Sequence, residues 1–439
     1  MTENQRPAVP LRAEARRAAA QPQPDDQWRL QHVALAPHRL GFFLAMVLLI
    51  ASGLWWALVQ VDRVSTALSL PYAVAPSLVH AAVMSFGFFP LFFAGFLFTA
   101  GPKWLHVDPP PVSALMAPLL LQAGGWLAWL VGAAWAQGLA LAGCTVAWAG
   151  LLWMSGLFVR LVLRSPQQDQ MHARSIAAAC LWGCLCVAGL GLSLAAGRAD
   201  LARLWVLSGL WGFITVVFAV VAHRMIPFFT ASALPAVQAW RPYWVLWLML
   251  VALAVQAAAV WLQTADGRGA ALPAVLRVRG PLELVVGILL LWLVWRWGWV
   301  QSFRNRLLAM LHVGFMWLGL AFVLLGVAHG WGGLQGASVW DLGALHALTM
   351  GCLGSLMLAM VTRVSCGHSG RALVADQLAW GLFWLLQLAT VLRLAATAPL
   401  ALAPWLLALA ALLWAGIMAV WGLRLAAWYG KLRVDGKPG

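Results

Sequence analysis

Long apolar segments, separated by short polar connections, follow one another along almost the whole chain. Each comes close to the roughly 20 residues that an α-helix needs to cross the hydrocarbon core of a bilayer. Short segments of alternating polarity are lacking in the sequence, so the pattern predicts an all-α protein and argues against a β-barrel. We expect twelve spans, at residues 40–60, 76–100, 112–134, 136–163, 175–196, 202–222, 242–262, 281–299, 307–328, 340–362, 373–396 and 402–427.

The composition supports this interpretation, because 63% of the 439 residues are hydrophobic and only 9% are charged. A soluble protein of this length cannot bury so much apolar surface, so we expect a polytopic membrane protein whose surroundings are the lipid bilayer. Three parts are predicted: a disordered basic tail at 1–35, a transmembrane domain at 36–430 and a C-terminal tail at 431–439.

The net charge of +15 would suit a nucleic-acid partner, but the basic residues are spread over short connections instead of forming one soluble patch. Most of them lie on one side of the predicted spans, and that side also carries both termini. Lysine and arginine are enriched in cytoplasmic connections of membrane proteins. We therefore expect both termini in the cytoplasm and no nucleic-acid partner.

Two histidines fall inside predicted spans at a similar depth. His80 lies in the second span and His346 in the tenth, and both spans run from the outside to the inside. At a rise of about 1.5 Å per residue, both histidines lie in the outer leaflet. Ionisable groups at such depth are rare and commonly functional. Since two imidazoles from different helices can ligate one haem iron, the pair predicts a b-type haem between them.

The neighbours of the two histidines suit a flat cofactor. Met84 and Gly87 follow the first histidine on the same helical face, and Met350 and Gly354 lie on or near the face of the second. Glycine lets a planar ring approach the backbone, and methionine provides adaptable apolar contact. Ordinary helix packing is the alternative explanation, because small residues are common where membrane helices meet.

Three further groups carry candidate roles. Arg393, near the outer end of the eleventh span, can pair with the propionates of a haem or simply extend to the membrane surface. His312 in the ninth span is a candidate for a second metal site, and a hydrogen bond to a carbonyl or hydroxyl group is the alternative. Cys180 and Cys184 share a helical face; we interpret them as small buried side chains, with copper ligation as the alternative.

Other polar groups near the spans give weaker signals. Pro227 is expected to stop the sixth span and to leave Arg224 at the membrane surface. The scarce carboxylates approach the spans only at Glu283 and Asp341, both near outer ends. A proton pump usually needs a relay of ionisable groups through the membrane, and the sequence indicates none.

Four segments contain several of these residues, and they run from His80 to Pro102, ending Ala-Gly-Phe-Leu-Phe-Thr-Ala-Gly-Pro, from Arg224 to Thr230, from His346 to Arg371 and from Asp435 to Gly439. Together these segments resemble the NnrS family. These are bacterial inner-membrane proteins that are reported to contain haem and copper and are linked to nitric oxide and denitrification. The resemblance therefore implies haem, copper and a location in the bacterial inner membrane.

The chain departs from the family pattern beside His80. The second-span motif of the family usually reads His-x-His-Glu-Met, and here Ala82 and Val83 stand at its second histidine and its glutamate. A copper or proton-transfer role of these two positions is therefore in doubt, whereas His80 and Met84 keep their places in the motif.

The arrangement is also similar to the catalytic subunit of haem–copper oxidases, which has twelve spans and takes haem ligands from its second and tenth helices. Histidines of the sixth and seventh spans hold copper in that fold. Here the sixth span has only His223 at its inner end and the seventh has none. We therefore expect no oxidase-type binuclear centre.

The leading hypothesis is that the protein binds haem b between His80 and His346 and acts in the response to nitric oxide or in denitrification. Two histidine ligands leave no open position on the iron, which favours electron transfer or sensing. A redox enzyme acting on nitric oxide or another small molecule is the second hypothesis, and a cofactor-free transporter is the third. The sequence leaves open whether a substrate is turned over, whether copper is bound and which partner exchanges electrons.

Overall fold

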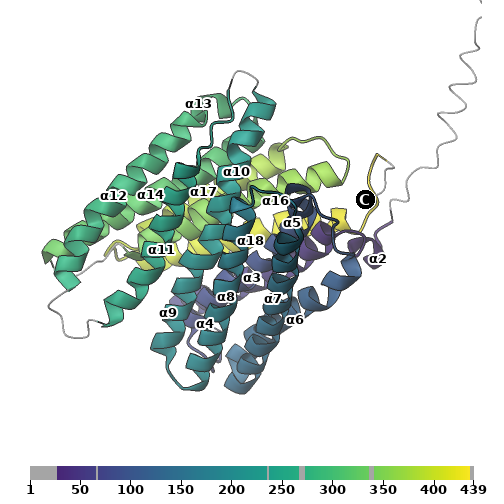
Figure 1. Ribbon diagram of the computed structural model, residues 1–439. Helices are drawn as coiled ribbons and strands as arrows, with labels where there is room; N and C mark the ends of the chain where they lie inside the picture. The colour runs from purple at the N-terminus through teal and green to yellow at the C-terminus, as the bar shows by residue number, and fades with distance from the viewer. Residues whose placement is uncertain (1–26, 66–67, 235–236, 266–271, 336–340, 436–439) are drawn as a thin grey trace, which may run out of the picture.

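Twelve helical segments of the chain are long and apolar enough to cross a membrane, as the sequence predicts (Figure 1). The structure, a computed structural model, describes residues 27–65, 68–234, 237–265, 272–335 and 341–435. Within these ranges it contains helices and connections but no strands. The spans are α3 (Pro37–Ser65), α4 with α5 (Pro76–Phe86, Phe89–Leu105), α6 (Val112–Trp135), α7 (Gln137–Arg164), α8 (Met171–Ala195), α9 with η1 and α10 (Ala199–Gly209, Leu210–Ile214, Thr215–Ala233), α11 (Tyr243–Ala265), α12 (Leu272–Arg296), α14 (Arg306–Gln335), α15 with η2 and α16 (Asp341–His346, Ala347–Gly354, Ser355–His368), α17 (Gln377–Ala395) and α18 (Ala403–Tyr429).

The two ends of the described chain meet on one side of the helical bundle. The backbone N–H of Arg29 donates to the carbonyl oxygen of Gly430 at 2.8 Å, and the short helix α2 (Leu30–Val33) lies beside the C-terminal segment (Figure 1). We call this the terminal side and the opposite one the far side. Of the predicted tails, residues 1–26 and 436–439 lie outside the described residues.

The spans expected at 112–134 and 136–163 form a tight helical hairpin, because only Ala136 separates α6 from α7. The predicted end of the sixth span at Pro227 is wrong. Helix α10 continues through this proline to Ala233. Proline removes one backbone donor, but packed neighbours make this tolerable inside membrane helices. The sixth span is therefore longer than the sequence suggests.

The second span is broken in its middle. Helix α4 ends at Phe86 and α5 starts at Phe89, with Pro90 in its first turn. Proline has no N–H, so it cannot donate to the carbonyl four residues earlier, which is that of Phe86. The side chain of Gln122 on α6 supplies the missing donor, because its Nε2 lies 2.7 Å from the Phe86 carbonyl oxygen. In apolar surroundings such a freed backbone group must be satisfied from within the protein.

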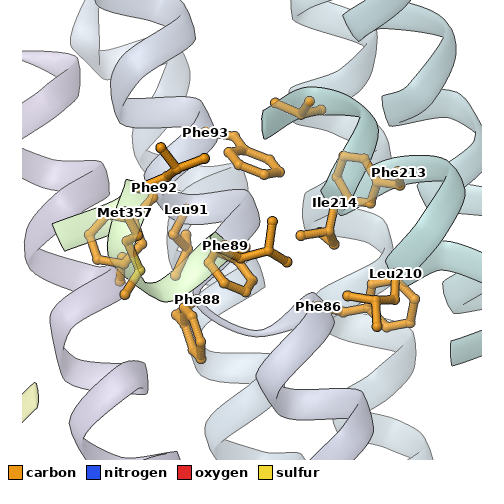
Figure 2. Close-up of a cluster of buried hydrophobic side chains, with 14 of the residues drawn as sticks. Phe86, Phe88, Phe89, Leu91, Phe92, Phe93, Leu210, Phe213, Ile214 and Met357 are labelled. Carbon is orange, nitrogen blue, oxygen red and sulfur yellow. The ribbon is translucent and has the colours of Figure 1, made fainter. Parts of the chain in front are cut away.

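Aromatic side chains surround this break. Figure 2 shows Phe86 beside Leu210 of η1, while Phe89 and Phe93 stand on the α5 side of the break. The rings of Phe93 and Phe213 meet edge to face, with 5.8 Å between their centroids. These packed rings hold the two halves of the second span in a fixed arrangement.

Two spans contain π-helical segments, η1 in the sixth and η2 in the tenth. A π-helix has hydrogen bonds between residues five apart, so it shifts the faces of the helices on either side relative to one another. Segments of this kind are frequent at functional sites. Because η2 begins directly after His346, it determines how this histidine is oriented relative to α16.

Candidate functional site: two histidines on the far side

His80 lies one turn into α4, close to the far end of the second span. Its imidazole stacks on the indole of Trp56 from α3, with ring centroids 3.9 Å apart and an angle of 19° between the planes. The Nδ1 atom is buried and has no hydrogen-bond partner among the described residues. The stacking fixes the plane of the ring while leaving a nitrogen unused, as a metal ligand requires.

His346 ends the short helix α15, at the far end of the tenth span. Its Nδ1 lies 2.7 Å from the carbonyl oxygen of Leu342, one turn earlier. A carbonyl only accepts, so Nδ1 carries the proton and a neutral ring has its lone pair on Nε2. This is the arrangement usual for metal-ligating histidines, in which the second ring nitrogen donates to a backbone carbonyl.

The two histidines and Arg393 form one electrostatic group. His80 lies within electrostatic range of His346, and Arg393 lies within electrostatic range of both imidazoles. Arg393 lies in the last turn of α17, where its side chain is partly buried. Within the described part of the chain its guanidinium has neither an ion pair nor a hydrogen bond. The structure thus brings these three predicted residues together from three helices.

The other predicted contact residues lie around this group in different ways. The Sδ of Met84 is 3.9 Å from the hydroxyl oxygen of Ser52, and Met350 packs against the hydrophobic core. Gly87 sits at the break of the second span, where a Cβ atom would lie 2.4 Å from the Val83 carbonyl oxygen. This glycine therefore has a backbone role of its own.

Gly354 leaves room for an indole. A Cβ atom at this position would lie 3.1 Å from the ring of Trp414 on α18. The same ring packs against Gly53 of α3, where a Cβ would lie 3.4 Å away. The buried Nε1 of Trp414 has no hydrogen-bond partner among the described residues. The space beside Gly354 is thus bounded by an aromatic wall with an unused donor.

The candidates for further metal ligands have other neighbours. Both ring nitrogens of His312 face backbone carbonyls, with Nδ1 3.0 Å from the oxygen of Leu308 and Nε2 3.3 Å from that of Trp297. Cys180 and Cys184 are both buried in α8. In the part of the chain that the structure describes, no three His, Cys, Asp or Glu side chains are grouped to hold a metal ion.

A buried polar cluster on the far side was missed by the sequence analysis. Glu283 of α12 accepts hydrogen bonds at Oε1 from Arg279 at 2.7 Å and from Gln256 of α11 at 2.6 Å. Its Oε2 lies 2.5 Å from Nδ1 of His329 on α14. Nε2 of His329 lies 3.3 Å from a carboxylate oxygen of Asp341. The only sequence signal was the spacing of four residues between an arginine and a glutamate, which places them on one helical face.

Histidines also pair on the terminal side, and their positions in the sequence do not indicate this pairing. The rings of His38 and His368 lie 4.2 Å apart, and Nε2 of His172 lies 3.0 Å from Nδ1 of His223. Beside the second pair, the Tyr243 hydroxyl donates to Asp169 and holds the pKa of that carboxyl below its ordinary value. The partners come from helices distant in sequence, so only the folded chain shows the pairs.

Comparison with curated proteins gives no match. The sequence model of one protein family, described as NnrS protein, matches residues 32–433. This match covers all twelve spans, including both histidines of the far-side group. The chain therefore belongs to the NnrS protein family.

Proposed function

We propose that the protein binds a b-type haem between His80 and His346 in the bacterial inner membrane and acts in the cellular handling of nitric oxide. The observation that carries this proposal is the grouping of two imidazoles with unused nitrogens beside an unpaired guanidinium. Membership of the NnrS family supports the link to metal cofactors and to nitric oxide.

The residues of the group fit what a haem needs. Haem iron can be held by two histidine nitrogens, and His80 and His346 would offer one each from two different spans. The haem also carries two propionates, for which a guanidinium is a suitable partner. Arg393 meets this need, since among the described residues nothing else pairs with it. An uncompensated cation in a membrane span is costly, so an anionic ligand would stabilise it.

A haem with two histidine ligands supplies one-electron transfer without an open iron position. The residues around the two histidines would orient it. Trp56 keeps the ring of His80 fixed by stacking, and the Leu342 carbonyl fixes the protonation of His346. Copper is not part of the proposal, because both ring nitrogens of His312 already face carbonyl oxygens.

The test is optical. The protein is purified in detergent, and absorption spectra of the oxidised and reduced forms are recorded together with the haem content per chain. We expect a low-spin haem spectrum in the wild type and a loss of haem, or a high-spin spectrum, in His80→Ala and His346→Ala. His106→Asn is the control, because His106 is exposed on the terminal side and asparagine tolerates its left-handed backbone conformation.

A rescue experiment separates ligand loss from misfolding. In His80→Gly, added imidazole is expected to restore the low-spin spectrum by occupying the space of the missing side chain. A wild-type protein without haem would overturn the proposal. Haem that stays low-spin in both alanine variants would overturn the assignment of the ligands.

A further inference from the structure

The far-side cluster around Glu283 is an ionic group inside a membrane-spanning region. Glu283 and His329 are only 3% and 1% exposed, and Gln256 is 1% exposed. Buried ionisable groups in spans are costly and are retained mainly where they function. We therefore expect the Glu283 cluster to have a function of its own, separate from that of the two-histidine site.

The close approach of α12 and α14 brings these groups into contact. A Cβ atom at Gly280 would lie 2.6 Å from the backbone nitrogen of Gly330, and one at Gly326 would lie 2.7 Å from that of Leu284. With the two backbones touching, the short side chain of Glu283 reaches Nδ1 of the histidine on the neighbouring helix. The contact is thus built into the packing of the two spans.

The geometry specifies a protonated imidazole. His329 faces Glu283 with Nδ1 and Asp341 with Nε2. Ionised carboxylates only accept hydrogen bonds, and an imidazole can donate from both nitrogens only when it carries the extra proton. Counting charges gives the same result: two carboxylates and Arg279 leave one negative charge, which the proton on His329 neutralises.

Asp341 connects this cluster to the two-histidine site. It is the first residue of α15, and His346 is the last, so six residues form the whole helix. The side chain of Asp341 is 43% exposed, whereas that of His329 is 2% exposed. The contact between them therefore ties the helix that carries His346 to α14 and offers a proton a way in from the far surface.

We propose that Glu283, His329 and Asp341 form a proton-binding site on the far side whose occupancy sets the position of α15 and hence of His346. Without the proton, one ring nitrogen of His329 presents a lone pair to a carboxylate, and the lone pair and the carboxylate oxygen repel each other. Asp341 is the more exposed of the two partners, so it separates from His329 more easily than the buried Glu283 does. Within the described chain, His329 is in contact with Glu283 of α12 and Asp341 of α15, with Arg279 of α12 nearby, and Gln256 of α11 reaches it only through Glu283.

The proton site is tested without reference to haem. Solid-state NMR of protein labelled with ¹⁵N-histidine in lipid distinguishes doubly protonated from neutral imidazoles. At neutral pH we expect a doubly protonated signal from His329, which disappears in His329→Gln and changes to a neutral signal in Glu283→Gln. Asp108→Asn, an exposed carboxylate on the terminal side, is the control and should leave the signal unchanged. Absence of the signal in the wild type would overturn the proton site.

The coupling to His346 rests on the proposed function and is tested separately. Asp341→Asn keeps the shape of the partly exposed partner, so it should fold. We expect the reduction potential of the haem to depend on pH in the wild type and this dependence to weaken in Asp341→Asn, with no change in Asp108→Asn. An unaltered pH dependence in Asp341→Asn would overturn the coupling. A doubly protonated His329 in a protein without haem would support the proton site and overturn only the haem proposal.

Discussion

Replacing Gln122 with leucine should destabilise the protein at the break of the second span. The Gln122 amide donates to the Phe86 carbonyl in place of the donor that Pro90 lacks. Leucine has a similar volume but no donor, and an unsatisfied buried polar group costs about 1–3 kcal/mol. The Oε1 of Gln122 is itself buried without a partner among the described residues, so its removal offsets part of the cost. We expect a net loss of about 1–2 kcal/mol.

The free energy of unfolding is measured for the purified protein in one detergent, with the same denaturant series for each variant. Gln137→Leu is the matched control. Gln137 donates to the Leu194 carbonyl at 3.1 Å, but the N–H of Gly197 donates to the same oxygen at 3.0 Å. Because that carbonyl keeps a partner, the control should change the free energy by no more than about 0.5 kcal/mol.

A double-mutant cycle provides the refutation. Pro90→Ala restores a backbone N–H that can reach the Phe86 carbonyl, so the cost of Gln122→Leu should shrink in this background. If the cost is the same with proline and with alanine, the glutamine does not replace the missing donor. An equal loss in Gln137→Leu would also refute the reasoning, since it would reveal a general cost of the substitution.

Asp376→Asn should lower stability at neutral pH but not in acid, because hydrogen bonds from Arg424 hold the pKa of the Asp376 carboxyl below its ordinary value. A lowered folded pKa contributes stability above the ordinary value and loses it as pH falls through the folded value, so melting curves of the two proteins should converge there. A constant difference at all pH values would contradict this. Gly326→Val should destabilise by about 1–3 kcal/mol or more, since its Cβ would meet the backbone of Leu284. Gly156→Val, which faces open space, is the control for the same unfolding measurement, and equal losses would contradict the packing argument.

The spans could be predicted because the bilayer imposes a length and an apolar composition on each of them. Length and composition do not predict where a helix bends, breaks or continues within a span. The sequence predicts that Pro227 ends a helix, but packing against neighbouring helices carries the helix past it. The break at Gly87 and the π-helical η2 were not predicted either, because local composition there does not differ from an ordinary span.

In the candidate site, too, the sequence predicts some features and not others. His80 and His346 could be placed on the same side from topology alone, and the structure brings Arg393 to both. The contact between Glu283 and His329 joins positions 46 residues apart on two helices. Each is an isolated polar residue in the sequence, and only the glycine contacts between α12 and α14 make them partners.

The hydrogen bond between Arg29 and Gly430 places the two ends of the described chain next to each other. The first span α3 packs along the last span α18, so the two terminal spans are neighbours in the bundle. A circular permutant that joins these ends and opens the exposed α5–α6 connection at Asp108 should keep every span in place. Its new ends would emerge on the same side as the present ones, which makes this connection a suitable point for attaching a reporter within the sequence.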